Sequence, residues 1–181
     1  MALNRSYAPT RHQIKFRFRA RNRWLFGCVK TTRRRLADLL NSDEGNTIVV
    51  ADDVGVLDVV GDQGSRAIGH VNISTSTILF AIPVEDEPHR PDIPIRSTRK
   101  LERVVVGVGP YEIEGTLFLL PEARPRDVLM SVASPFIVIA EAVIRLAGDS
   151  SFVEEHGAVL VNRQHVDFIG LAPEASSHQP I

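Results

Sequence analysis

The chain carries one pattern of apolar and polar residues twice. In the first copy WLFGCVK is followed by RRRLADLLNS, TIVVADDVGVLDVV and HVNISTSTILFAI, and in the second EIEGTLFLL is followed by RPRDVLMSV, PFIVIAEAVIRLA and AVLVNRQHVDFIGL. The aligned residues include Gly27 with Gly115, Asp38 with Asp127 and Asn72 with Asn162, at offsets of 88, 89 and 90 residues. Self-similarity of this kind indicates that the repeated segment is the folding unit.

Alternation with a period of two marks the start of each copy as a strand. Apolar Ile14, Phe16 and Phe18 alternate with basic side chains, which is typical of a half-buried strand. A returning strand with an early glycine, Gly27 or Gly115, follows in both copies, and a missing side chain there permits a bulge or sharp curvature. The pattern predicts a mainly β fold of two tandem small β-barrel-like domains, each with about five strands and one short helix.

Later segments of each copy complete this expectation. Short helices are predicted over 33–41 and 124–132, β-branched strands over 47–51 and 135–140, continuing strands over 54–60 and 143–146, and loops over 61–66 and 148–155. The apolar faces predict a core of Phe16, Phe18, Trp24, Phe26, Ile48, Val50, Ile78, Phe80, Val104, Val106, Ile113, Leu117, Phe136, Val138, Val161, Phe168 and Ile169.

Composition shifts suggest where the units begin and end. We expect a first repeat over 11–84, a Pro-rich linker over 85–100, a second repeat over 101–173 and a polar tail over 174–181.

A resemblance to a known type of domain accompanies the repeat. Through EIEGTLFLLPEARPRDVL, PFIVIAEAVI and AVLVNRQHVDFI, the second copy resembles an uncharacterised bacterial small-β-barrel domain of the Sm-like or SH3-like kind, and the first copy is similar but more diverged. Sm proteins are similar in strand order and form rings that bind RNA. Their helix precedes the first strand, whereas the helical segment here follows the second, so no site residue is carried over.

Charge is divided unevenly along the chain. Residues 1–40 contain eleven Lys and Arg and one Asp, a net charge of +10, so the rest must carry −11 to reach the total of −1. This asymmetry predicts a basic surface that meets nucleic acid, an anionic membrane face or the protein's own acidic second half.

The candidate binding residues form a basic row on the first strand: Lys15, Arg17, Arg19, Arg21 and Arg23. Their spacing along a strand is similar to that of phosphates in a single-stranded nucleic acid. The alternatives are that the row protects an edge strand from unwanted pairing or contacts a protein partner. A sequence pI near 6.6 and the lack of aromatic residues interleaved with the arginines argue against nucleic acid.

Signals for catalysis, cofactors and membranes are missing from the sequence. Cys28 is the single cysteine, which excludes an intrachain disulfide and a Cys-based zinc site, and it is expected to be a buried apolar side chain. No phosphate loop, dinucleotide fingerprint, GxSxG or HExxH motif occurs, so we predict no enzyme activity, no cofactor and no metal. Without an apolar leader or a span of about 18 apolar residues, we expect a cytoplasmic protein without membrane insertion.

These observations favour a non-catalytic interaction or scaffold protein. It is expected to self-associate as a homo-oligomer, or to dock on a larger protein assembly, through its basic N-terminal strand. The alternative is a module that binds RNA or single-stranded DNA through the same residues. A third hypothesis is a small-molecule sensor at the seam between the repeats.

Overall fold

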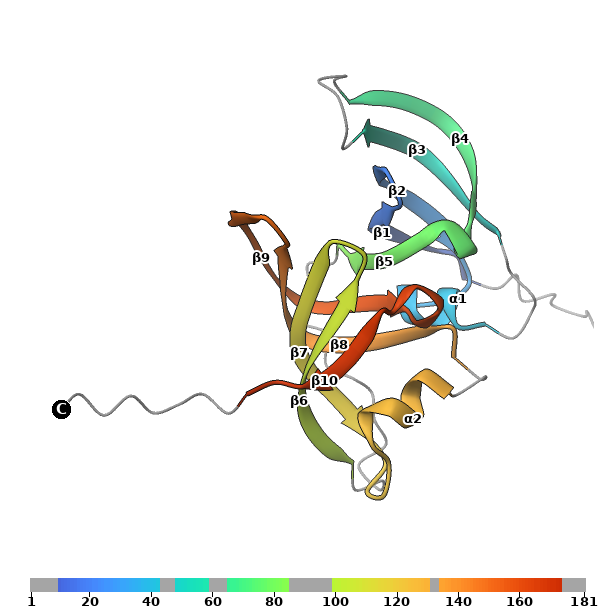
Figure 1. Ribbon diagram of the computed structural model, residues 1–181. Coiled ribbons are helices and arrows are strands. Elements are labelled where there is room, and N and C mark those ends of the chain that lie inside the picture. The colour runs from blue at the N-terminus through green and yellow to red at the C-terminus, as the bar shows by residue number, and fades with distance from the viewer. Residues whose placement is uncertain (1–9, 43–47, 59–64, 85–98, 131–133, 174–181) are drawn as a thin grey trace, which may run out of the picture.

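The fold is mainly β, as predicted, and the described residues form one antiparallel sheet of ten strands with two short α-helices (Figure 1). The computed structural model describes residues 10–42, 48–58, 65–84, 99–130 and 134–173. The first half contains β1 (His12–Ala20), β2 (Arg23–Thr31), α1 (Leu36–Leu40), β3 (Ile48–Asp58), β4 (Arg66–Ser74), the 3₁₀ turn η1 (Thr75–Thr77) and β5 (Ile78–Pro83). The second half contains β6 (Lys100–Val108), β7 (Tyr111–Leu119), α2 (Pro125–Met130), β8 (Phe136–Leu146), β9 (Asp149–Asn162), η2 (Arg163–His165) and β10 (Phe168–Leu171).

Both halves have the same strand order. The sheet runs β10-β6-β7-β8-β9-β5-β1-β2-β3-β4, so the order β5-β1-β2-β3-β4 of the first half is repeated as β10-β6-β7-β8-β9 in the second. The halves meet where β9 pairs with β5, and the outermost strands of the sheet are β10 and β4.

Strand register matches between the halves at a constant offset. β1 begins at residue 12 and β6 at residue 100, an offset of 88, and the same offset carries the pair Phe16↔Gly27 onto Val104↔Gly115. We call positions related by 88 residues counterparts.

The alignment of Asn72 with Asn162 proposed from sequence is wrong. β3 pairs Ile48 with Ser74, and β8 pairs Phe136 with Asn162, so the counterpart of Asn162 is Ser74 and not Asn72. Because side chains in a strand alternate with a period of two, a shift of two residues leaves the pattern of faces unchanged. The apolar and polar types alone therefore did not reveal the error.

A bulge bends the sheet at the same place in each half. The pairing of β2 with β3 shifts between Phe26 and Cys28, and the pairing of β7 with β8 shifts between Glu114 and Thr116. A Cβ on Gly115, between the last two, would lie 2.6 Å from the backbone oxygen of Ala140, which explains why a glycine is required.

These bulges also correct the predicted element boundaries. The described residues of the strands predicted over 47–51 and 54–60, which are 48–51 and 54–58, form one strand, β3, and the strands predicted over 135–140 and 143–146 form β8. Each passes through a residue with left-handed backbone, Asp53 (φ 52°) or Glu141 (φ 49°), instead of ending there. The loop predicted over 148–155 is wrong, because β9 starts at Asp149, directly after the turn at Gly148. The first helix, α1, is shorter than predicted, and the last two residues of the second predicted helix lie outside the described residues.

The cores of the two halves exchange side chains across their junction. Phe136 and Leu160 of the second half pack in the core of the first, and Trp24 and Phe80 of the first half pack in the core of the second. Most residues of the predicted core are buried, and Phe26, Val138 and Ile169 are partly buried. The prediction is wrong for Ile48, Val50 and Phe168, which are exposed.

The predicted boundaries of the repeats, linker and tail lie only partly within the described residues. The described part of the first repeat ends at Val84, and β6 begins at Lys100, the last residue of the predicted linker. The rest of that linker, apart from Arg99, lies outside the described residues, as does the tail over 174–181.

Candidate interaction surfaces

The seam between the halves begins as a short stretch of continuous sheet. β5 pairs with β9 at Phe80↔Val161 and Ala81↔Leu160, and all four side chains are buried. Buried Asn162 extends this junction, because its Nδ2 donates to the carbonyl oxygen of Ile78 at 2.9 Å. The seam is therefore held by backbone and side-chain hydrogen bonds away from water, where an unpaired partner is costly.

A side-chain amide fastens the first helix to the second half. Asn41, which follows α1, accepts a hydrogen bond from the backbone N–H of Phe136 at 2.8 Å. Its Nδ2 donates to the carbonyl oxygen of the same residue at 3.0 Å. Asn41 thus pairs with Phe136 as a neighbouring strand would, at the start of β8.

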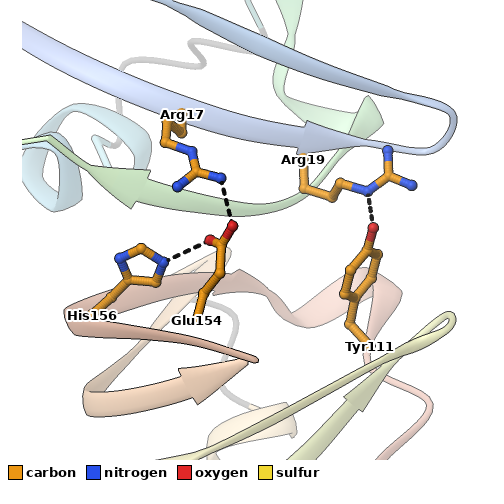
Figure 2. A network of polar contacts seen from close by, with 5 residues as sticks. All are labelled: Arg17, Arg19, Tyr111, Glu154 and His156. Atoms are coloured by element: carbon orange, nitrogen blue, oxygen red, sulfur yellow. Dashed lines mark hydrogen bonds and ion pairs between the residues drawn. The ribbon is translucent and has the colours of Figure 1, made fainter. Parts of the chain in front are cut away.

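Arg17 makes the charged part of the seam (Figure 2). Its Nη2 lies 3.1 Å from Oε1 of Glu154 on β9, and its guanidinium lies 4.8 Å from the centroid of the Trp24 ring. Glu154 also contacts Nε2 of His156 at 3.0 Å through its other oxygen. Burial raises the pKa of Glu154, but the hydrogen bonds with Arg17 and His156 outweigh burial, so the pKa is lowered overall.

Arg19 is the buried anchor of the seam. Only 3% of this residue is exposed, and its Nε donates to the hydroxyl of buried Tyr111 on β7 at 2.7 Å (Figure 2). Nη1 donates to the carbonyl oxygens of Ala20 and Arg23 at 2.6 and 3.0 Å. These bonds satisfy a charge that would otherwise be expensive to bury.

The predicted basic row is therefore divided in the folded chain. Arg17 and Arg19 turn toward the second half, whereas Lys15, Arg21 and Arg23 are exposed, and Arg23 forms an ion pair of 2.7 Å with Asp58. β1 lies between β5 and β2, so the row does not protect an edge strand. Of the partners that the charge asymmetry suggested, the acidic second half is the one that these contacts show.

Sequence reasoning missed the residues that receive this basic strand. Tyr111, Glu154, His156 and Asn41 were not singled out, because their roles depend on which strands lie side by side. Differences between the copies carry a signal. The counterparts of Arg17 and Glu154 are Val105 and Arg66, so each charge of this pair occurs in only one copy.

At its two ends the sheet is open. β4 pairs only with β3 and β10 only with β6 among the described strands, so each has one row of backbone groups that no strand pairs. Exposed apolar side chains accompany these strands: Ile48 (51%) and Val50 (48%) beside β4, and Phe168 (49%) in β10. Bare strand edges with apolar neighbours are templates for pairing with another chain.

Other polar groups are engaged in local ion pairs on the surface. Hydrogen bonds from His70 and Lys30 lower the pKa of Asp52, and a hydrogen bond from Arg103 is the largest influence lowering that of Glu114.

Within the described ranges, no cluster of three His, Cys, Asp or Glu side chains is arranged to hold a metal ion. Cys28 is a free, buried thiol. No helix in this part of the chain is long and apolar enough to cross a membrane.

A cavity of about 590 Å³ lies where α1 approaches the second half. Its lining is mostly apolar and includes Leu119, Val128 and Phe136, with Asp38 and Asn41 from the first half. The cavity therefore receives side chains from both repeats and has the size of a small-molecule site.

Comparison with known proteins provides no assignment. No family model, curated protein or solved structure matches the chain. The functional argument consequently depends on the seam, the open edges and the cavity.

Proposed function

We propose that this protein is a non-catalytic interaction or scaffold protein, built from two small β-barrel-like units, that self-associates. The observation that carries the proposal is the state of the two outer strands. Among the described strands, β4 and β10 each have one edge that no strand pairs, and exposed apolar residues flank both. Their counterparts, β9 and β5, are the strands that join the two halves.

The architecture supports two units of one kind. Each half has five strands in the same order, and each is bent by a bulge at a counterpart glycine. Such bends allow a short sheet to curl toward a barrel. In Figure 1 the long strands β3 and β4 curve together along one end of the molecule.

The basic strand has a different role in this proposal from the one expected. Arg17 and Arg19 join the halves of a single chain, through Glu154 and Tyr111, and the sheet ends provide the contacts with other molecules. Exposed Lys15 and Arg21 remain accessible for an acidic partner. The alternative of nucleic-acid binding is therefore tested alongside assembly.

Sedimentation velocity of the full-length 20.0 kDa chain tests the proposal. Self-association predicts species heavier than one chain whose fraction rises with protein concentration. A generic single-stranded oligonucleotide is titrated in parallel, and we expect little or no binding. A monomer at all concentrations contradicts the proposal. Tight oligonucleotide binding with a steep dependence on salt would favour the nucleic-acid alternative.

The cavity beside α1 supports a second candidate function, the binding of a small apolar molecule. An anilinonaphthalene sulfonate dye serves as the probe, because it fluoresces in apolar pockets. Ala37 lines the cavity, so Ala37→Trp should fill it and abolish saturable binding of the dye. Ala147→Trp, in an exposed turn, is the matched control. Equal dye binding by both variants would contradict this candidate.

A further inference from the structure

We infer that the seam is used a second time between molecules, with β10 of one copy paired antiparallel to β4 of the next. The inference depends on the proposed self-association and specifies its surfaces. In the seam, Phe80 pairs with Val161 and Ala81 with Leu160. Counterpart positions place Phe168 opposite Ile73 and Ile169 opposite Asn72 in the contact between copies.

The strand register of the two halves supports this contact. β10 pairs Phe168 with Gly107 of β6, as β5 pairs Phe80 with Arg19 of β1. On the other side, β4 and β9 match in the same way, as the pairs Ile48↔Ser74 and Phe136↔Asn162 show. The free edge of β10 is therefore equivalent to the edge of β5 that pairs with β9. In the same way, the free edge of β4 is equivalent to the edge of β9 that pairs with β5.

Exposed apolar side chains on and beside the two outer strands also support it. Phe168, Ile48 and Val50 are exposed although the sequence pattern predicts their burial. Their counterparts are Phe80 and Phe136, both buried, and Val138, which packs against the core of the opposite half. Phe80, Phe136 and Val138 are covered at the junction of the two halves within one chain. In the contact between copies, a second chain would cover Phe168, Ile48 and Val50 in the same way.

The surface around β10 is apolar in the same way. Val128, Val166 and Ile169 are only partly buried. The corresponding residues of the first half, Leu40, Ile78 and Ala81, are buried, and they belong to the core that receives Phe136 and Leu160. The second half therefore offers an incomplete apolar face, and Ile48 and Val50 of another copy are the side chains that would complete it.

The charged clamp of the seam is absent from the second contact. Val105 and Arg66 stand at the counterparts of Arg17 and Glu154, and Gly107 stands at the counterpart of Arg19. In addition, polar Asn72 replaces Leu160. The contact between copies should therefore be weaker than the seam and depend on protein concentration.

Two different surfaces meet in this contact, so it is heterologous. Each copy presents both surfaces, and repetition gives a closed ring if the rotation closes and a filament if it does not. This property makes the inference testable by mixing variants.

Two exposed positions allow each surface to be blocked separately. Val50→Asp should block the β4 surface, and Phe168→Asp should block the β10 surface. Each variant alone keeps only one of the two surfaces intact, so it should sediment as a monomer. An equal mixture should form a complex with one chain of each variant and nothing larger. Leu57→Asp, an exposed apolar position elsewhere on β3, is the matched control and should assemble like the wild type.

Circular dichroism checks that each variant is folded. Ile48→Asp and Val166→Asp, at two further positions of the same surfaces, replace any variant that fails this check. If the wild type is monomeric, the proposed function itself fails. If the wild type assembles but both variants still assemble alone, or if the mixture gives no complex, self-association stands and the β10–β4 contact is wrong.

Discussion

Replacing Tyr111 by phenylalanine removes one atom from the centre of the seam. The hydroxyl of Tyr111 accepts a hydrogen bond from Nε of Arg19 at 2.7 Å, and both residues are buried. The ring of Tyr111 lies 5.1 Å from the guanidinium carbon and remains in the variant. The change therefore isolates the hydrogen bond from the packing.

The cost follows from the environment of Arg19. Its Nη1 keeps two backbone acceptors in the variant, but Nε loses the acceptor provided by Tyr111. A hydrogen bond to a charged group contributes roughly 1.5 to 3 kcal/mol to stability. In a chain of this size, that loss lowers the Tm by roughly 3 to 12 °C.

Thermal and urea unfolding measure this effect, and a double-mutant cycle with Arg19→Met attributes it. The sum of the two single losses should exceed the loss in the double variant by about the energy of the hydrogen bond. A Tyr111→Phe variant within about 0.5 kcal/mol of the wild type, or two losses that simply add, would refute the role of this pair in joining the halves.

Three further changes test other parts of the seam and the fold. The pKa of Glu154 is lowered from its ordinary 4.5, so its stabilising effect is present above that pH and is lost as pH falls through the folded value. Glu154→Gln should therefore cost about 1 kcal/mol at pH 7 and progressively less as the pH is lowered below 4.5, as urea unfolding over a series of pH values would show. Asn41→Ala leaves Phe136 without both amide partners and should lower the free energy of unfolding by about 1 to 3 kcal/mol, with Asn41→Asp in between, because Asp still accepts from the N–H. Gly115→Ala places a methyl group 2.6 Å from a backbone oxygen and should cost roughly 1 to 3 kcal/mol, whereas Gly157→Ala, with nothing within 4 Å, should lie within about 0.5 kcal/mol of the wild type in thermal melts.

Local patterns predicted much of the fold. Alternation identified β1 and placed Phe16 and Phe18 in the core, because the period of a strand is set by backbone geometry. The match between Gly27 and Gly115 agrees with the observed register. The boundaries of β3 and β8 were wrong because the bulged residues Asp53 and Glu141 resemble chain breaks.

The candidate site was harder to predict because it depends on contacts between distant segments. Arg17 and Arg19 stand out in the sequence as cations, but nothing local shows that β9 and β7 supply Glu154 and Tyr111. The exposure of Phe168 could not be predicted either, because the pattern of apolar residues in the sequence does not show which part of the fold covers each side chain.

Disulfide trapping tests the contact between copies most directly. Residues directly opposite in an antiparallel pair have Cα atoms about 4.5 to 5.5 Å apart, within the range that a disulfide can span. In a Cys28→Ala background, Asn72→Cys and Ile169→Cys are introduced into the same chain. Asn72→Cys with Gly170→Cys is the control, because a shift of one residue points the second thiol to the opposite face.

Mild oxidation followed by non-reducing electrophoresis reads out the register. The β10–β4 contact predicts a ladder of multimers, reversible with reductant, for the Asn72 and Ile169 pair and much less for the control. A chain that assembles by sedimentation but gives no ladder, or gives equal ladders with both pairs, would contradict the account.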